Sequence, residues 1–541
     1  MASITQNAEE IPVKIVGSSI FGRYPFISAE RTYNMFISDE ALVNFAGYEE
    51  ANSPDSLDRE GRGIFHSIRG NFLLVVVANK LYKITDINSF AVVRGTFDTF
   101  SGEVFMDENL ASQIMIVDGS NAYIYNWHDD SFGKPTTIEA QITAGTLIPN
   151  YVTYQNTHFI VGNGALTPEG SQWYVYLPGT GFQLGVDIVQ LGNTFYTLTL
   201  QTKPDYAKAA LRIPGKGNSL LVLGSSVGEI WQDIGDANIY RRNSTVNIDY
   251  GCISVATIAS SDDYVAWLGI NEKSSASIMV MTGGGAERLS TDGIDYLLST
   301  IQHPTDSTAM FYRQDGHVFY QITFFNAADN ITIVYDFTTK KFYDLTDHNY
   351  DYHPARQFAF FQNHTYFVSK KNGHVYQMGT DITVYSTNAS TVYEIPRIRT
   401  CDTQRMPRPE KFRVNLFTFT IENGTEEGVN YVADCVGYLI TESSNGALVP
   451  SEVVIITEEG LPILAEGGYC GIYKPRIDVS ISKNGGRDFS SSVPYYMHKT
   501  AHYKNQPRFN RLGSCNMITI QMRFWGFWRF ISENGIIEIS Q

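Results

Sequence analysis

The sequence has few cysteines, and their spacing excludes two common kinds of small stabilised domain. The five cysteines, Cys252, Cys401, Cys435, Cys470 and Cys515, are far apart and odd in number, and they form no Cys-x-x-Cys pair. This spacing argues against a zinc ribbon and against a disulfide framework. We therefore expect five reduced thiols in a protein that is made and assembled in the cytoplasm.

Long apolar segments are also missing. No apolar run approaches the roughly 20 residues that a membrane-spanning helix needs. Residues 1–20 contain Glu9, Glu10 and Lys14 among polar residues, without a basic start followed by an apolar core. The sequence therefore predicts neither a secretory signal nor a membrane segment.

Positive charge is scarce, and the deficit is uneven along the chain. The chain has 40 Lys and Arg against 56 Asp and Glu, a net charge of −16. Residues 1–381 hold 24 basic and 40 acidic residues, which gives −16, whereas residues 382–541 hold 16 of each. Such a surface has no basic footprint for tight binding to phosphate backbones. We expect contact with nucleic acid, if any, to be non-adhesive.

What the sequence has in plenty is glycine and aromatic residues. It contains 45 Gly, 33 Tyr and 32 Phe, and charged residues make up only 18%. This composition suits many short strands joined by turns. With 541 residues the chain is long enough for two or three domains. We expect an all-β protein.

The clearest local pattern lies in residues 209–291. An apolar run at 219–223 is bounded by Gly217 and Gly224, and an alternating run at 227–231 follows a tight turn. One such hairpin cannot bury its own apolar face. Further short runs, separated by turn residues, follow at 252–260, 265–269, 278–282 and 288–290. Repeated units of four antiparallel strands indicate the blades of a β-propeller.

The same plan recurs on both sides of this stretch. Units of this kind are predicted at 63–95, 104–140, 151–201, 308–345 and, incompletely, 357–378. In the second unit the outer strand is expected at 136–140. The N-terminal strand around residues 31–37 is expected to complete the last unit and close the ring. The pattern predicts six to eight blades.

After residue 381 the pattern changes to longer strands. They are predicted at 393–400, 411–420, 476–482, 506–512, 517–525 and 528–539, and they indicate a β-sandwich-like domain. Residues 421–475 look like an inserted β-rich tip with nine acidic residues and one basic residue, Lys474, for a net charge of −8. Such an insertion is either an interaction hairpin or a solvated loop. The expected domains are an extended N-terminal segment (1–62) joining the propeller, a propeller (63–381) and a C-terminal β domain (382–541).

Few motifs suggest chemistry. His348, Asp351 and His353 could present metal ligands, but their spacing fits no zinc motif and favours a turn between blades. Residues 283–285, three glycines, lack the lysine of a phosphate loop and favour a hairpin turn. Residues 482–489 resemble the Asp-box hairpin of sialidases, with Asn484 in the usual Asp position, and favour a folding turn.

Catalytic signatures are absent as well. No His-Glu-x-x-His pattern occurs, and the Gly-x-Ser-x-Gly arrangement at 224–228 falls in the tight turn of the predicted hairpin rather than between a strand and a helix. The adjacent carboxylates at 262–263 and 458–459 would point to opposite faces of a strand, so they do not form an acid and base pair by themselves. We predict no catalytic, cofactor-binding or metal-binding residue, and no enzyme activity.

The order of features resembles the packaged-DNA stabilisation proteins, also called tail hub or nozzle proteins, of short-tailed bacteriophages. The resemblance covers most of residues 20–381 loosely and is one of pattern rather than of catalytic signature. The segments that carry it are Leu-Leu-Val-Leu-Gly-Ser-Ser at 220–226, Glu-Ile-Trp at 229–231, Asp-Tyr-Gly-Cys at 249–252, Val-Ala-Trp-Leu-Gly at 265–269, Ile-Met-Val-Met at 278–281 and the N-terminal segment 28–36.

The resemblance implies a structural virion protein. Members form a homohexameric ring below the portal and adaptor, hold the packaged genome and let double-stranded DNA pass at ejection. The adaptor is the implied partner, together with a tail tip or needle and tail fibres or spikes. An acidic lumen would repel the DNA backbone and keep it from sticking.

An alternative function is a glycan-binding or glycan-hydrolysing propeller, such as a sialidase-like phage adhesin. It requires clustered arginines or paired carboxylates at the propeller mouth. A cellular scaffold propeller also fits the composition, but it explains neither the N-terminal resemblance nor the C-terminal domain.

Overall fold

The computed structural model describes residues 9–22, 29–176, 195–235, 239–388, 391–406, 410–424, 438–442, 448–454, 476–497, 504–526 and 529–540. The chain divides into two compact units. The propeller unit comprises Ser18–Met35 and Phe45–Pro396, and the C-terminal unit comprises Met1–Gly17, Phe36–Asn44 and Arg397–Gln541. Each unit is assembled from segments that are far apart in the sequence.

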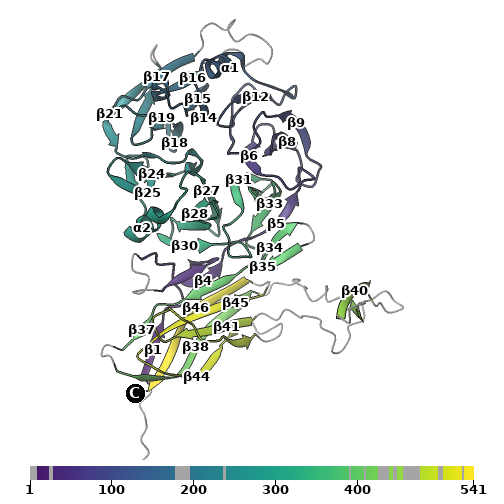
Figure 1. Cartoon of the computed structure of the whole chain (residues 1–541), viewed down its shortest axis with the longest axis vertical. Coiled ribbons are helices and arrows are strands. Elements are labelled where there is room, and N and C mark those ends of the chain that lie inside the picture. The colour runs from purple at the N-terminus through teal and green to yellow at the C-terminus, as the bar shows by residue number, and fades with distance from the viewer. Residues whose placement is uncertain are drawn as a thin grey trace, which may run out of the picture. The chain divides into compact units, whose positions relative to one another are not determined.

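In its described residues the propeller unit contains seven sheets built on four-stranded antiparallel meanders, arranged around a ring (Figure 1). The first four blades are β6 (Gly61–Ser67), β7 (Phe72–Val77), β8 (Lys80–Ile84) and β9 (Val92–Thr96); β10 (Phe105–Glu108), β11 (Gln113–Val117), β12 (Ala122–Asn126) and β13 (Ser131–Gly133); β14 (Pro149–Gln155), β15 (His158–Asn163), β16 (Gln172–Tyr176) and β17 (Phe195–Thr199); and β18 (Ala209–Ile213), β19 (Lys216–Leu223), β20 (Gly228–Asp233) and β21 (Tyr240–Ile248).

The remaining three blades continue the ring. They are β22 (Gly251–Cys252) with β23 (Ala259–Ser260), β24 (Val265–Asn271), β25 (Ser274–Met281) and β26 (Ala286–Arg288); β27 (Ser307–Gln314), β28 (His317–Phe324), β29 (Ile331–Asp336) and β30 (Lys341–Leu345); and β31 (Ala355–Phe361), β32 (His364–Ser369), β33 (Val375–Gly379) and β5 (Gly47–Asn52). The count lies within the predicted range and confirms the propeller.

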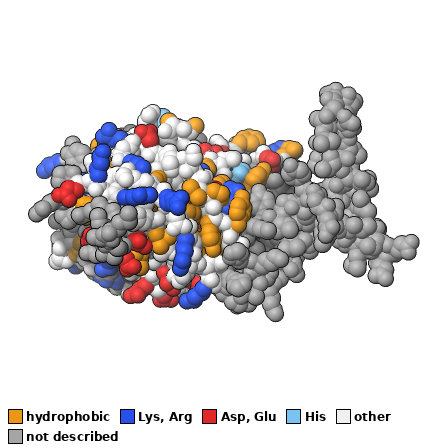
Figure 2. Space-filling view, turned by 90° about the horizontal axis from the view of Figure 1, so that it is seen from below, with side chains coloured by type: hydrophobic (Ala, Val, Ile, Leu, Met, Phe, Trp, Pro, Cys, Tyr) orange, Lys and Arg blue, Asp and Glu red, His pale blue; other side chains and the backbone are white. Residues whose placement is uncertain are grey.

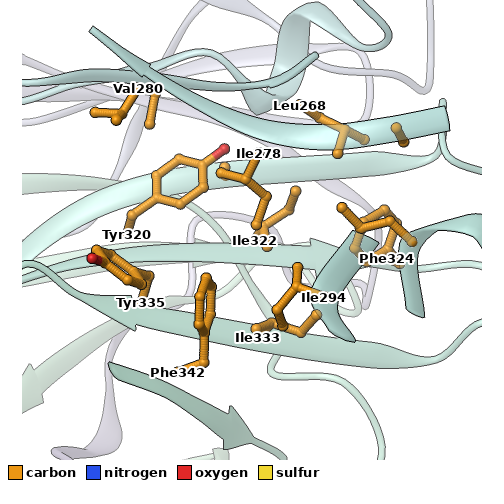
Figure 3. Packing of buried hydrophobic residues seen from close by; sticks show 14 of the residues in the cluster. Leu268, Ile278, Val280, Ile294, Tyr320, Ile322, Phe324, Ile333, Tyr335 and Phe342 are labelled. Atoms are coloured by element: carbon orange, nitrogen blue, oxygen red, sulfur yellow. The ribbon is translucent and has the colours of Figure 1, made fainter. Parts of the chain in front are cut away.

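Each blade buries its apolar faces against the blades on either side. Between the fifth and sixth blades, Leu268, Ile278, Tyr320, Ile322 and Ile333 pack together with at most 1% of each side chain exposed (Figure 3). The short helix α2 (Asp292–Thr300) covers this cluster with Ile294 and Leu298. A single sheet would leave these groups in water, so the ring of sheets is the unit that folds.

The strand that closes the ring is not the predicted one. β5 pairs antiparallel with β33, from Gly47 opposite Gly379 to Asn52 opposite Val375. The predicted strand at 31–37 is divided: β2 (Arg31–Tyr33) runs parallel to β30 of the sixth blade, and β3 (Met35–Ser38) leads into the C-terminal unit. The sequence Gly-Tyr-Glu-Glu-Ala-Asn of β5 has little apolar signal.

Glycine is required where β5 begins. A Cβ atom on Gly47 would lie 2.4 Å from the carbonyl oxygens of Ile382 and Val384, so a larger residue could not fit beside the following hairpin. That hairpin, β34 (Val384–Asn388) and β35 (Thr391–Glu394), extends the seventh sheet beyond β5.

A second correction concerns the outer strand of the second blade. Residues 136–140 belong to a helix, α1 (Thr136–Thr143), and the outer strand is the three-residue β13. Pro135 precedes the helix, where proline is compatible with a helix start, and Ile138 is buried. A strand of three residues is too short to produce a periodic signal.

In its described residues the C-terminal unit contains two large sheets and a separate two-stranded sheet within the insertion 421–475. In the first, β46 (Arg529–Ser540) lies between β38 (Phe412–Gly424) and the N-terminal strands β1 (Glu9–Val13) and β4 (Ala41–Asn44), and β38 also pairs with β43 (Lys504–Asn505) and β44 (Arg508–Cys515). The second consists of β36 (Arg397–Thr400), β45 (Met517–Trp525), β41 (Arg476–Ser482) and β42 (Val493–Tyr496), with β37 (Gln404–Arg405) beside β45. Phe524 and Phe530 bring the two sheets into contact, with ring centroids 5.7 Å apart.

Two expectations about this unit need comment. Residues 9–17 and 36–44, expected in the segment that joins the propeller, lie in the C-terminal unit because β1 and β4 cover one edge of β46. Within the insertion 421–475, β39 (Tyr438–Glu442) pairs with β40 (Leu448–Val454). The rest of the predicted tip after residue 424 lies outside the described residues, as does its charge distribution.

None of the helices in the described residues has the length and the apolar character needed to cross a membrane.

Candidate functional site: the propeller axis

Residues of the inner strands and of the loops beside them line two neighbouring cavities at the propeller axis. One has a volume of about 390 Å³ and is lined by charged and polar groups that include Asp118, Asn150 and Asp306. The other has a volume of about 180 Å³ and is lined mainly by apolar and aromatic groups, such as Met106 and Met310. Glu103, Phe105 and Ala256 line both cavities, so they mark the boundary between the two.

A buried ionic cluster lies at this boundary. Arg356 Nε donates to Glu103 Oε2 at 2.9 Å, and its NH1 group pairs with Glu60 and donates to the carbonyl of Gly61 at 3.0 Å. The second carboxylate oxygen of Glu103 accepts hydrogen bonds from Gln357 Nε2 at 2.7 Å and from Thr308 Oγ1 at 3.1 Å. The cluster therefore joins the first, second, sixth and seventh blades.

The charged state of this cluster depends on mutual pairing. Burial raises the pKa of Glu103, and Arg356 opposes that effect. Burial acts to lower the pKa of Arg356, but the carboxylates of Glu103 and Glu60 outweigh it, so its pKa is raised. An unpaired charge at this depth would be costly, and each partner therefore requires the other.

A second buried arginine holds the loop that carries Glu103. Arg62 has no exposed surface and donates to the carbonyl oxygens of Gly102 at 2.8 Å, Thr99 at 2.9 Å and Ala78 at 3.0 Å. Thr99 in turn donates to Asp118. The guanidinium takes the place of backbone partners that a loop between blades lacks.

A comparable buried polar contact links the second, third and fourth blades. The buried carboxylate of Asp107 accepts a hydrogen bond from the backbone nitrogen of Tyr154 at 2.6 Å and lies 3.4 Å from the guanidinium of Arg212. These polar groups are satisfied by one another. The axis is thus a cross-linked interior, and the arginine among its lining residues, Arg356, is already paired with two carboxylates.

The predicted metal candidates lie in the turn between β30 and β31, and the structure gives them separate protein partners. The ring of His348 stacks on Tyr393 at 3.9 Å, and Asp351 accepts from Asn330 Nδ2 at 2.6 Å. His353 is buried against the ring of Tyr48, 5.3 Å away. No group of three or more His, Cys, Asp or Glu in the described part of the chain is placed to hold a metal ion.

The other motifs behave as turns. Asn484 Oδ1 accepts from the backbone nitrogens of Arg487 and Asp488, and its amide donates to the Asp488 side chain, which closes the turn between β41 and β42. Residues 283–285 connect β25 to β26. Asp262 pairs with Arg313 at 2.9 Å, whereas Glu458 and Glu459 lie outside the described residues.

The surface charges visible on one face of the molecule are of mixed sign. Figure 2 shows Lys and Arg side chains and Asp and Glu side chains in small separate groups, beside a group of apolar side chains. This face offers no continuous basic field that would hold a nucleic-acid backbone.

Sequence reasoning did not find the Glu103–Arg356 cluster. Glu103, Thr308 and Arg356 are separated by up to 253 positions, and each stands alone among turn or strand residues. The only local signal is a charged residue at the start of an inner strand, as for Arg356 next to the apolar run of β31.

Comparison with known proteins shows which family part of this propeller resembles. No curated protein sequence matches the chain. A chain in the crystal structure of the mitotic checkpoint complex is similar, with a TM-score of 0.37 and 10% identity, over 61% of this chain and 92% of that one. Residues 199–383 match the family model described as Bacteriophage P22 Gp10, beta-propeller. The match extends from β17 to just beyond β33 and agrees with the resemblance found in the sequence. Over these residues the chain is similar to the phage stabilisation family, the family of the P22 Gp10 β-propeller.

Proposed function

We propose that this protein is a structural subunit of a short phage tail. It forms a nozzle or hub ring below the portal and adaptor, retains the packaged genome and conducts DNA at ejection. The observation that carries the proposal is the family match over residues 199–383, which covers the blades from the fourth onward. The role is structural rather than catalytic.

The small cavities and the side-chain pairs at the axis limit where DNA could pass. The larger axial cavity has a volume of about 390 Å³, and Glu103 and Arg356 cross its boundary with the smaller one. The major groove of B-DNA alone is about 12 Å wide. A duplex therefore cannot run through a single propeller, so the proposed passage lies between subunits, in the lumen of a ring.

The charge of the propeller supports a passage to which DNA does not adhere. Residues 1–381 carry 24 basic and 40 acidic residues, a net charge of −16. Acidic side chains such as Asp58, Asp262 and Asp292 are 78%, 83% and 95% exposed. An acidic lumen repels phosphates, whereas a basic lumen would bind many of them at once.

The ring is proposed to be a homohexamer, in line with the family resemblance. Subunits in a closed ring meet through two different patches, so the contacts are heterologous. The adaptor is the proposed partner on one side, with the tail tip and fibres or spikes as further partners.

The test is to mix the purified protein with the portal and adaptor of the same genome and to image the product by electron microscopy without imposed symmetry. We expect a sixfold ring attached to the adaptor, with Asp and Glu along its lumen. The matched control is the same mixture without adaptor. A protein that stays unbound, or a lumen lined mainly by Lys and Arg, would contradict the proposal, and turnover of a surface polysaccharide would favour the adhesin alternative.

A further inference from the structure

The seventh blade contains the seam of the propeller ring. Its inner three strands come from the C-terminal end of the propeller sequence, and β5 comes from the N-terminal end. The ring is therefore closed by strand pairing between β33 and β5, without a continuous chain across the seam. Any group that ties β5 to β33 also controls the closure of the ring.

One histidine lies at this seam between two carboxylates. His374 directly precedes β33 and is 9% exposed. Its Nδ1 atom is 3.6 Å from Glu50 Oε2, on β5, and its Nε2 atom is 3.3 Å from Asp58 Oδ1, in the segment between β5 and β6. Each ring nitrogen thus faces an acidic group from a different part of the N-terminal chain.

The contact between Glu50 and His374 lacks a hydrogen bond. Glu50 Oε2 and His374 Nδ1 are both buried, and neither makes a hydrogen bond within the described part of the chain. A buried polar atom without a partner is costly. A small approach of the two atoms, with a proton on Nδ1, would satisfy both at once.

Other charged groups near the seam are already engaged. The amines of Lys370 and Lys371, on the turn before His374, bind Asp306 at 2.8 Å and Asp347 at 2.6 Å. The guanidinium of Arg59, next to Asp58, lies 3.7 Å from Asp55. The phenol of Tyr376, whose ring lies 6.3 Å from that of His374, donates to the carbonyl of Thr387. These pairings leave the imidazole as the group that faces both Glu50 and Asp58.

The turn that carries His374 is pressed against the first blade. Gly373 has a φ of +72°, and a Cβ atom on it would lie 2.5 Å from the Val77 side chain and 2.7 Å from the carbonyl oxygen of Arg59. The backbone nitrogen of Arg59 also donates to the carbonyl of Asn372 at 3.3 Å. The histidine and its two carboxylates are therefore held together only while the seam is closed.

We propose that His374 is a pH-dependent clasp on the seam of the propeller. A neutral imidazole carries one N–H and no charge, so it can donate to one carboxylate at most. After taking a proton from solvent, the imidazolium donates from both nitrogens and attracts both Glu50 and Asp58. Acidification supplies this proton, so it tightens the seam. This inference concerns ring closure and does not depend on the proposed phage role.

Hydrogen exchange of β5 in the full-length protein, read by mass spectrometry, tests the clasp. The wild type is compared with His374→Gln at about pH 8 and about pH 5.5, so that the intrinsic exchange rate cancels at each pH. We expect similar rates at pH 8, and at pH 5.5 exchange of β5 that is about three- to tenfold slower in the wild type. A ratio that is the same at both pH values would overturn the proposal.

Two further variants control for the loss of any histidine in this blade and for a His374→Gln protein that does not fold. His364→Gln removes an exposed histidine of the same blade, whose ring faces Gln377 and, among the described residues, pairs with no carboxylate; it should leave the pH dependence unchanged. Asp58→Asn alters a mostly exposed side chain and should fold even if His374→Gln does not. Acidification must change the hydrogen exchange of β5 less in this variant than in the wild type. If β5 of the two proteins responds to acid equally, Asp58 is not part of a clasp.

Discussion

Acidification should destabilise the propeller through His353, which lies in the turn between the sixth and seventh blades. The side chain is 1% exposed, and its Nδ1 lies 3.4 Å from Gln321 Nε2. Its Nε2 atom is buried and makes no hydrogen bond within the described residues. Burial, aided by the nearby charge of Lys371, lowers the pKa of His353 to about 3.

The sign and size of the effect follow from proton linkage. Because the native state keeps His353 neutral, the unfolded chain binds the extra proton between pH 6.5 and pH 3. The stabilisation is complete above pH 6.5 and is lost as the pH falls toward 3. With these pKa values the contribution to the free energy of unfolding falls by about 2 kcal/mol at pH 5 and about 3 kcal/mol at pH 4.

The assay is urea unfolding followed by tryptophan fluorescence at several pH values, for the wild type and His353→Gln. Trp173, Trp231 and Trp267 are fully buried in the propeller and report on its unfolding. Gln cannot titrate, so between pH 7.5 and pH 5 the free energy of unfolding of the variant should fall by about 2 kcal/mol less than that of the wild type. His364→Gln, at an exposed site, should follow the wild type. Parallel pH profiles for the wild type and His353→Gln would refute the reasoning.

Three other changes probe the architecture. Arg356→Met leaves Glu103 and Glu60 without their buried cation and should lower the free energy of unfolding by about 3–5 kcal/mol in the same urea assay. Adding Glu103→Gln should recover part of this loss. If the effects of the two substitutions were fully additive, the pairing would be contradicted. Gly293→Ala places a Cβ atom 1.2 Å from the carbonyl oxygen of Phe21, so residues 18–22 should detach and become sensitive to limited proteolysis. Unchanged digestion would show that the helix moves instead. Deleting residues 1–17 removes β1 from the edge of β46 and should lower the melting temperature of the C-terminal unit in calorimetry, and a shift of the propeller transition alone would contradict this assignment.

The sequence by itself determined the features that depend on neighbouring residues. Apolar runs such as 219–223 and turns such as Asp315–Gly316, with φ values of +49° and +83°, produce hairpins wherever they occur. Repetition of these hairpins implies blades, because an isolated four-stranded sheet leaves its apolar faces exposed. For the same reason the glycine run at 283–285 and the motif at 482–489 could be interpreted as turns without knowledge of the fold.

Only the tertiary structure decided which distant segments meet. β5 closes the ring although its sequence is mostly polar, because Tyr48 packs against Tyr385 and Gly47 fits beside the next hairpin. The pairing of Glu103 with Arg356 joins residues 253 positions apart. Short-range patterns carry no information about such contacts, whose free energy comes from burial and charge pairing in the assembled ring. Local periodicity therefore specified the blades, and packing specified how the ring is closed and what lies on its axis.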